Sequence, residues 1–544
     1  MIPADPYGQA LTVGSVPAMH AASPVTRDKV AVTEGERQLT WRELDERSTR
    51  VAAALIGYGV RPGEPVALYS GNRIEYIELM YGLAKAGCPI VPLSPRYVAA
   101  EVMGAVGATG ARALVTDSPG SLGLPAAGAP EGALTVARLA GPGVAGARDF
   151  PALAGDVQPY EDLLASAGPA CAAGGSAELA EPDENVPFRL SLTSGTTGAP
   201  KVCVVPQRVA MQGWAEMGIG LGIGPDDVEL VAGPLFHGLG FTCALQQLYV
   251  GGSLVIHRRF DAREVLGSVA RDKVTIVPGV PVIFDRILAE LKSSGSAGAG
   301  TRSVRLVMTS GARAGGPLKR RLAGAFPGAV ICEFLAGTET GIITVNREDP
   351  NGPKADSCGL PFFRTRLAIL DEAGAARPRG EVGEVAKRGL LTGPVYLGDD
   401  TRTAEAFRDG WFRTGDLGYV DEDGYLFLVG RSKDVIVSGG INVYPAEIED
   451  VIRGMPGVRE AAVVGIPDET WGESVKAVLV LDEGVAYAPG EIERRCRAEL
   501  AGYKVPRVIA FTGALPRTGS GKVLNRELAS VPGFRRTGDG WSGE

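Results

Sequence analysis

The segment from Ser191 to Val202, SLTSGTTGAPKV, combines glycine, hydroxyl and lysine side chains at close spacing. Gly195 and Gly198 allow backbone N–H groups to turn toward a bound anion, because glycine adopts conformations that other residues avoid. Further donors and charge come from Thr193, Ser194, Thr196, Thr197 and Lys201. These groups suit a triphosphate, although such a cluster taken alone could also be a polar surface turn.

The segment is not a Walker A motif, which needs adjacent Gly and Lys followed by Ser or Thr. Ala199 and Pro200 separate the last glycine from Lys201. A second Gly-Lys pair near the C-terminus ends in Lys522 and is followed by Val523, so it fails the same pattern. Phosphate binding by the glycine-rich segment therefore needs support from other motifs.

Composition limits the classes of partner. The net charge of −8 offers no long-range attraction for a polyanion, so we expect neither nucleic acid nor a membrane as a partner. Seven scattered cysteines without a CxxC pair are typical of a reduced, cytoplasmic protein, and no export signal is expected. Three histidines without ligand spacing do not predict zinc. The sequence does not indicate the oligomeric state, and a homodimer is one possibility.

The length of 544 residues predicts two or more domains. Helical spacing at residues 40–59 and 74–87 alternates with apolar strands at 65–70 and 89–94, which predicts a parallel sheet covered by helices. Residues 120–184, rich in Gly, Ala and Pro, are expected to form a surface loop with a hairpin.

The second half of the chain changes character. Short strands with Asp-Gly turns predict a small β subdomain at residues 367–430. The segment 431–544 has its own strand and helix pattern and is long enough for an independent α+β domain. The predicted fold is therefore an α/β N-terminal domain at 1–430, built from parallel-sheet subdomains plus the β subdomain, and a small C-terminal domain at 431–544.

Six motifs in order resemble those of the adenylate-forming enzymes, which include acyl-CoA synthetases, nonribosomal-peptide adenylation domains and firefly-type luciferases. The resemblance runs from about residue 39 to about residue 528, with the glycine-rich segment as the phosphate loop. The other motifs are PLFHGLGF (234–241), GTETG (337–341), GWFRTGDLGYVDEDGYLFLVGR (410–431), KDVIVSGGINVYPAEIE (433–449) and PRTGSGK (516–522). One such motif would be weak support, whereas six in the same order are specific.

The resemblance implies a two-step reaction. A carboxylate and ATP form an acyl-AMP and pyrophosphate, and a thiol, usually that of coenzyme A, then accepts the acyl group. Because the first step brings two anions together, cationic groups must neutralise the charge on the phosphoryl oxygens. The family assigns this to Lys522, with Mg²⁺ held near Thr196 and Glu339. The small domain is implied to be mobile, with a hinge at Lys433.

Further site residues follow from the same resemblance. Asp416 is expected to accept hydrogen bonds from the ribose hydroxyls, with Arg431 close by. Ser438, Gly439 and Gly440 are expected to form a narrow passage for the pantetheine arm of CoA. The remaining residues assigned to the nucleotide site, besides those of the phosphate loop, are Gly311, Ala312, Leu335, Ala336, Gly337 and Thr338.

The acyl-pocket motif indicates the type of acid. His237 stands where the family has an aromatic residue or a histidine that gates the carboxylate pocket, although a histidine in an apolar run is often only part of the core. Relatives that activate amino acids usually carry an Asp here, and PLFHGLGF has none. We therefore expect an aryl, alicyclic or fatty carboxylic acid.

One motif departs from the family. Before Thr338 and Glu339 the family commonly has Tyr-Gly, whose ring stacks on adenine, whereas this chain has Leu335 and Ala336. Loss of an aromatic face could forfeit about 1 kcal/mol of stacking free energy with adenine.

The main hypothesis is an ATP-dependent carboxylic acid:CoA ligase. The alternatives are an enzyme that only transfers a preformed acyl-AMP to the thiol, one that acylates an amine or a carrier-protein thiol, and a non-enzymatic nucleotide-binding module.

Overall fold

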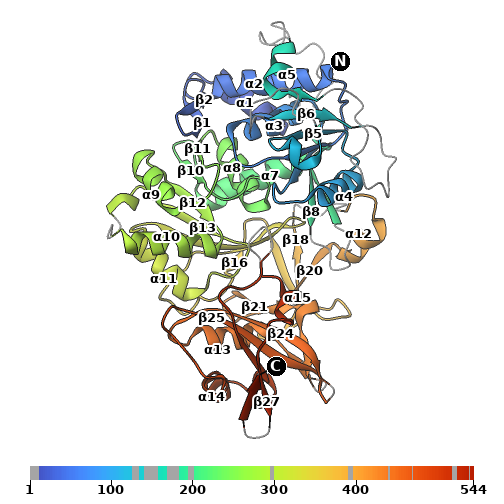
Figure 1. Ribbon diagram of the computed structural model, residues 1–544. Helices are drawn as coiled ribbons and strands as arrows, with labels where there is room; N and C mark the ends of the chain where they lie inside the picture. Colours follow the sequence, from blue (N-terminus) through green and yellow to red (C-terminus); the bar gives the residue numbers. More distant parts are fainter. Residues whose placement is uncertain are drawn as a thin grey trace. The chain divides into compact units, whose positions relative to one another are not determined.

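The computed structural model describes residues 11–124, 134–139, 157–167, 183–193, 201–294, 299–389, 396–438, 441–468, 470–517, 523–537 and 540–543 (Figure 1). The chain forms two compact units. The first comprises Met1–Ala355, Phe362–Thr365 and Arg388–Gly410, and the second comprises Asp356–Pro361, Arg366–Lys387 and Trp411–Glu544. The predicted domain boundary at residue 431 is the position of an expected hinge. The division into compact units does not test a hinge, so this boundary stays a prediction.

Two β-sheets organise the described part of the first unit. The strands of sheet A lie in the order β15 (Gly341–Asn346), β14 (Val330–Gly337), β13 (Leu306–Thr309), β12 (Ile276–Gly279), β10 (Val228–Val231), β11 (Ser253–Ile256), β1 (Val30–Glu34) and β2 (Arg37–Thr40). Those of sheet B lie in the order β7 (Gln158–Pro159), β6 (Thr135–Arg138), β5 (Ala113–Thr116), β3 (Val66–Tyr69), β4 (Ile90–Leu93), β8 (Pro187–Thr193) and β9 (Lys201–Pro206). Parallel pairing in the middle of each sheet confirms the predicted α/β class.

Helices cover both faces of each sheet. The largest hydrophobic core lies between the sheets and buries one face each of α2 (Trp41–Gly57), α7 (Gln207–Leu221) and α8 (Gly238–Tyr249). It also surrounds α3 (Ile74–Lys85), which is buried on all sides. The other face of sheet A packs against α9 (Ala262–Arg271), α10 (Pro281–Ser293) and α11 (Gly315–Ala325), and that of sheet B packs against α4 (Ala99–Thr109) (Figure 1). The outer elements of the unit are α1 (Val16–Ala22), α5 (Tyr160–Ser166) and α12 (Asp400–Ala406).

Local sequence accounts for the expected elements. Helix α2 begins with a capping box, in which Thr40 Oγ1 accepts from the Glu43 backbone N–H and the Glu43 carboxylate accepts from that of Thr40. Strand β3 is buried at all four positions, as expected for a central parallel strand. In the segment expected to be a loop, β6 and β7 pair as an antiparallel hairpin, and α5 follows without having been predicted.

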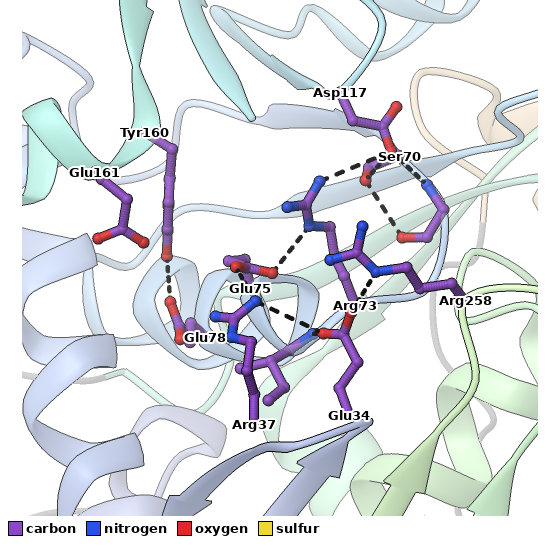
Figure 2. Close-up of polar contacts among 12 residues, drawn as sticks. Glu34, Arg37, Ser70, Arg73, Glu75, Glu78, Asp117, Tyr160, Glu161 and Arg258 are labelled. Carbon is purple, nitrogen blue, oxygen red and sulfur yellow. Dashed lines mark hydrogen bonds and ion pairs between the residues drawn. The ribbon is translucent and has the colours of Figure 1, made fainter. Parts of the chain in front are cut away.

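A buried ion-pair network joins the two sheets at the start of α3. Glu34 of sheet A accepts from the backbone N–H of Ile74 at 2.8 Å, while Arg73 contacts Glu75 at 2.9 Å (Figure 2). Asp117, which follows β5, accepts from the Ser70 hydroxyl at 2.9 Å. Burial alone would raise the pKa of Glu75, but the hydrogen bond and charge of Arg73 lower it to about 2. Polar groups at the strand ends therefore stabilise one another here.

The second unit contains a small antiparallel sheet, as predicted, formed by β17 (Arg366–Leu370), β18 (Gly383–Arg388), β20 (Trp411–Val420) and β21 (Leu426–Arg431). Asp423 and Gly424 form the turn between its last two strands. A second sheet has the order β23 (Ile441–Val443), β22 (Ile436–Ser438), β25 (Gly472–Leu481), β26 (Val508–Phe511), β27 (Phe534–Thr537) and β28 (Gly540–Gly543), with β24 (Val458–Asp468) also pairing with β25. Helices α13 (Pro445–Arg453) and α14 (Pro489–Glu499) cover one of its faces and α15 (Asn525–Leu528) the other.

The helices that the structure describes are too short or too polar to cross a bilayer.

Sheet A contains a buried carboxyl group with no hydrogen-bond partner among the described residues. Both side-chain oxygens of Glu229, on β10, are unpaired, and the residue is fully buried. Burial, with a smaller effect of the Asp227 charge, raises the pKa of Glu229 well above its usual value. The protonated form of Glu229 is therefore favoured in the folded protein relative to the unfolded chain.

We predict that Glu229→Gln changes how stability depends on pH. Because the folded pKa lies above the unfolded one, the contribution of Glu229 is complete below about pH 4 and is lost as the pH rises. Wild-type protein should lose up to about 1.4 kcal/mol per pH unit more than the variant between pH 5 and 8. Urea denaturation across this range measures the difference.

The control is Glu405→Gln, at an exposed position. Its denaturation curves should follow those of the wild type. Parallel pH profiles for wild type and Glu229→Gln would contradict the assignment of a protonated buried carboxyl.

Candidate active site

Strands β8 and β9 hold the two ends of the glycine-rich segment. They pair antiparallel, with Thr193 opposite Lys201 and Ser191 opposite Cys203. The rest of the predicted phosphate loop, namely Ser194, Gly195, Thr196, Thr197 and Gly198, lies outside the described residues. The backbone on either side of the loop is therefore fixed by a sheet edge.

Glu339 lies in the tight turn between β14 and β15, at the edge of sheet A. Its Oε1 atom accepts a hydrogen bond from the Tyr396 hydroxyl at 3.0 Å. Its Oε2 atom makes no hydrogen bond to the described residues. A Cβ atom at position 337 would lie 2.9 Å from Thr340 Oγ1, so a larger residue there would require the Thr340 side chain to move.

Tyr396 connects this turn to the strand that follows the phosphate loop. The backbone N–H of Leu397 donates to the Val202 carbonyl at 2.9 Å, and Tyr396 forms a β-bridge with Cys203. The ring of Tyr396 is 8% exposed, and its centroid lies 5.1 Å from Lys201 Nζ. Glu339 and Lys201 are thus positioned through one aromatic side chain.

Buried neutral groups surround this carboxylate. Burial, and then the charge of Glu339, raises the pKa of the Tyr396 hydroxyl. Burial, followed by Glu339, raises the pKa of the Cys203 thiol to about 12. Both groups are neutral at physiological pH, so Tyr396 acts as a hydrogen-bond donor and Cys203 is not a thiolate nucleophile.

Glu339 is a suitable ligand for the Mg²⁺ ion that the family resemblance implies. Carboxylate oxygens are preferred by this cation, which usually keeps several water ligands and binds only one or two protein carboxylates. The hydrogen bond to Oε1 fixes the orientation of the group while Oε2 remains available. No cluster of three or more acidic, histidine or cysteine side chains suited to a metal occurs in the described ranges. Thr196, the other expected ligand, is outside those ranges.

The remaining residues expected near the nucleotide follow the strand ends of sheet A. Gly311 and Ala312 come directly after β13, and Gly311 has a φ of +83°, which favours glycine. Leu335 is half-buried and Ala336 is exposed, at an irregularity in the pairing of β14 with β15. Thr338 is half-buried beside Glu339.

His237 occupies the position before helix α8. It is exposed, and its backbone carbonyl accepts from the N–H of Phe241 at 2.9 Å. The following residues of the acyl-pocket motif therefore form the first turn of a helix between the two sheets. The gating role of His237 stays a prediction.

In the second unit, Asp416 and Arg431 lie opposite each other on β20 and β21. Arg431 Nε contacts Asp416 Oδ1 at 2.8 Å, and Asp416 is 9% exposed. The structure thus brings together the two residues expected to act near the ribose. The contact with Arg431 orients the Asp416 carboxylate, which suits acceptance of two hydroxyl donors.

The other predicted residues of this unit fall near the strand ends. Lys433 is exposed in a short 3₁₀ turn, Ser432–Asp434, after β21. Ser438 is 5% exposed and pairs with Ile441 across the glycine loop. Gly439, Gly440 and Lys522 lie outside the described residues.

Sequence reasoning did not find Tyr396. The residue lies 57 positions after Glu339, outside the six motifs. A single tyrosine in a Gly-rich stretch carries no periodic or spacing signal. Its contact with Glu339 depends on tertiary pairing with β9.

Comparison with known proteins identifies the family. Residues 19–397 match the family described as AMP-binding enzyme, and residues 447–522 match the AMP-binding enzyme C-terminal domain. A feruloyl-CoA synthase from Amycolatopsis sp is 35% identical over 526 residues, with 95% of this chain and 98% of that protein covered. A fatty acid–[acyl-carrier-protein] ligase from Streptomyces coeruleorubidus is 33% identical, with 96% of each chain covered.

The solved structures agree. The structure of an anthranilate CoA ligase in complex with anthranoyl-AMP is 26% identical, covers 96% of this chain and 97% of its own, and has a TM-score of 0.79. The chain therefore belongs to the AMP-binding enzyme family, within the adenylate-forming superfamily, and is an enzyme of the acid–thiol ligase class. The resemblance inferred from the six motifs is confirmed.

We predict that Tyr396→Phe weakens the function of Glu339 without disrupting the fold, because the ring and its packing are retained. A hydrogen bond to a charged group contributes about 1.5–3 kcal/mol. The variant should need about 10-fold more Mg²⁺ for half-maximal pyrophosphate release, as measured by a Mg²⁺ titration. Tyr69→Phe removes another buried hydroxyl, bonded to Pro95 and Tyr97 carbonyls, and should leave this requirement unchanged. Equal Mg²⁺ profiles for Tyr396→Phe and wild type would contradict the positioning role.

We predict that Leu335→Tyr restores an aromatic face for adenine. A gain of about 1 kcal/mol should lower the KM for ATP by roughly 5-fold. The matched control is Val330→Tyr, at the exposed other end of β14, which should leave that KM unchanged. Steady-state kinetics with ATP varied tests this, and an unchanged or raised KM in Leu335→Tyr would show that adenine does not reach this position.

Proposed function

We propose that this enzyme is an ATP-dependent carboxylic acid:CoA ligase that forms an acyl-AMP and transfers its acyl group to the thiol of coenzyme A. The observation that carries the proposal is the placement of Glu339 by Tyr396 at the strand that follows the phosphate loop. Conversion of a carboxylate and ATP into an acyl-AMP needs a fixed group for cation binding and hydroxyl or amide donors for the phosphates. Glu339 provides such a carboxylate, and the proposed phosphate loop, whose flanking strands β8 and β9 pair with each other, would provide the donors.

Residue roles follow from this proposal. Lys522 stabilises the charge that develops as the carboxylate oxygen attacks the α-phosphorus. Glu339 and Thr196 hold Mg²⁺, which neutralises phosphate charge when bound. Asp416, held by Arg431, accepts the ribose hydroxyls. The phosphate-loop hydroxyls and Lys201 orient the leaving pyrophosphate.

The substrate is proposed to be an aryl, alicyclic or fatty acid. Absence of an acidic residue from PLFHGLGF leaves no group there to pair with the ammonium of an amino acid. Relatives named for ferulate and anthranilate favour an aryl acid. Coenzyme A is proposed as the acceptor, with the CoA-ligase relatives in support.

A second candidate function is transfer to a carrier-protein thiol. It is favoured by the similarity to a fatty acid–[acyl-carrier-protein] ligase, which is nearly as strong as that to the feruloyl-CoA synthase. A third is transfer of a preformed acyl-AMP, motivated by Leu335 and Ala336 at the adenine position.

Pyrophosphate release with a panel of acids separates these functions. We expect acid-dependent release without CoA, limited to about one turnover, and continuous release with CoA. Continuous release only with a carrier protein would favour the second function. Consumption of synthetic acyl-AMP and CoA, with no release from ATP and any acid, would favour the third and contradict the proposal.

The same assay tests the lysine. Lys522→Met should lower the rate of adenylation by about 10² to 10³, the loss typical of one preorganised contact to a transition state. Arg526→Met, four residues later with 83% of its side chain exposed, is the control and should leave the rate unchanged. An unchanged rate of pyrophosphate release in Lys522→Met would show that this residue does not act in the first step.

A further inference from the structure

Arg189 is a buried cation with no anionic partner among the residues that the structure describes. It lies in the middle of β8 and is only 8% exposed, yet its Nε–H group has no acceptor in the described ranges. No carboxylate among the described residues forms an ion pair with its guanidinium group. Arginine remains protonated under physiological conditions, and an uncompensated buried charge is strongly unfavourable. This arrangement suggests that a bound molecule supplies the missing anion.

Neutral groups line the surroundings of Arg189. Its Cζ atom lies 4.6 Å from the centroid of the Phe241 ring, as in a cation–π contact. The ionisable side chains that act on it are Cys203 and Tyr76. Burial raises the pKa of both groups, so neither is an anion at neutral pH. The Tyr76 hydroxyl also has no hydrogen-bond partner in the described part of the chain.

The other two buried cations that the structure describes in the first unit, Arg73 and Lys319, are compensated. Arg73 contacts Glu75 at 2.9 Å in the network at the start of α3 (Figure 2). Lys319, which is 1% exposed, contacts Glu333 at 2.6 Å. The lack of a carboxylate beside Arg189 is therefore not a general property of this fold.

Arg189 faces the same side of sheet B as the residues of the candidate active site. Alternation along β8 places Arg189 and Ser191 on one face of the sheet, roughly 7 Å apart. Their partners on β9 include Cys203, which packs against Tyr396. The guanidinium group thus lies on the face that leads to the phosphate loop.

The contact with Phe241 places Arg189 beside the acyl-pocket motif as well. Phe241 lies one helical turn after His237 at the start of α8. The guanidinium group therefore lies between the strand that leads into the phosphate loop and the helix that begins with the acyl-pocket motif. If the acid substrate extends from the adenylated carboxyl group to Arg189, the group that contacts Arg189 is at the end of the substrate opposite that carboxyl group.

We propose that Arg189 binds a second anionic group on the acid substrate, so that the enzyme activates an elongated acid with a carboxylate or similar anion at the end opposite the carboxyl group that is adenylated. The inference rests on the proposed function, because it specifies the substrate of that site. Arg189 is a specificity-determining residue in this account. An anionic oxygen of ATP or of CoA has the same chemistry, and the tests below distinguish these sources.

The kinetic test compares a dicarboxylic acid with its monoamide, which has the same length and shape. Wild-type enzyme should prefer the diacid in kcat/KM, measured by pyrophosphate release. Arg189→Met should lower kcat/KM for the diacid by about 10- to 100-fold, mainly through KM, while the value for the monoamide changes by less than about 3-fold. Arg189→Lys should restore part of the preference. Equal losses for both acids, or no preference in the wild type over a series of chain lengths, would overturn the proposal.

The stability of the ligand-free protein gives an independent readout. Removal of an uncompensated cation should leave the Tm of Arg189→Met unchanged or raise it. The control is Lys319→Met, which leaves Glu333 without its cation and should lower the Tm. If Arg189→Met also lowers the Tm strongly and the acid preference is retained in Arg189→Lys and Arg189→Gln, the side chain has only a structural role and the proposal is wrong.

Titration calorimetry measures the Kd values of the diacid, ATP and CoA without requiring turnover. It therefore distinguishes which of these molecules supplies the anion that contacts Arg189. The Kd of the diacid should rise at least 10-fold in Arg189→Met, whereas those of ATP and CoA should not change. A rise confined to ATP or to CoA would assign the anion to a phosphate and overturn the proposal. If no acid releases pyrophosphate, the proposed function fails, but the comparison of diacid and monoamide binding still tests Arg189.

Discussion

The hydrogen bond from the Tyr396 hydroxyl to Glu339 ties the edge of sheet A to the strand that follows the phosphate loop in sheet B. The rest of the candidate site depends on this connection. Formation of an acyl-AMP requires a carboxylate and a triphosphate to approach each other, and the groups that offset their charge must be in place beforehand. A carboxylate at the end of a hairpin turn would otherwise be free to rotate, and a buried tyrosine fixes its orientation.

The distribution of charge in the first unit separates structural from functional groups. At the start of α3, ion pairs such as Arg73 with Glu75 compensate each other and join the two sheets. Glu339 keeps one oxygen available, and Arg189 has no anion at all among the described residues. Incomplete compensation of buried charge is costly and tends to occur where a ligand completes it. Arg189 lies on β8 of sheet B, and Glu339 lies at the edge of sheet A, where it contacts Tyr396, which pairs with β9 of sheet B.

The sequence allowed much of the fold to be predicted, for reasons that are local. Apolar positions at helical spacing in residues 40–59 identify α2, and the apolar run at residues 65–70 identifies β3. Short α5 was not predicted, because seven residues carry too little periodicity to separate a helix from a loop. The antiparallel β subdomain was predicted from short strands with Asp-Gly turns, because Asp-Gly between two strands favours a β-hairpin.

The site was predictable only where its residues lie in sequence motifs. Glu339, Asp416 and Arg431 were found because the motifs that contain them carry a recognisable spacing. Tyr396 was missed because its role comes from pairing with Cys203, far away in the sequence. Arg189 was missed because an arginine in a strand usually reaches solvent, and only the packing of Phe241 over it shows that this one does not.

Transfer of isotope from the acid to AMP tests the central claim most directly. An acid that supports turnover is labelled with ¹⁸O in its carboxyl group and incubated with the enzyme, ATP and CoA, and the AMP formed is examined by mass spectrometry. If the carboxylate oxygen attacks the α-phosphorus and the thiol then displaces AMP from the acyl carbon, each AMP molecule must carry one oxygen atom from the acid. Unlabelled AMP would contradict the account, because it would show that ATP is cleaved without formation of an acyl-AMP.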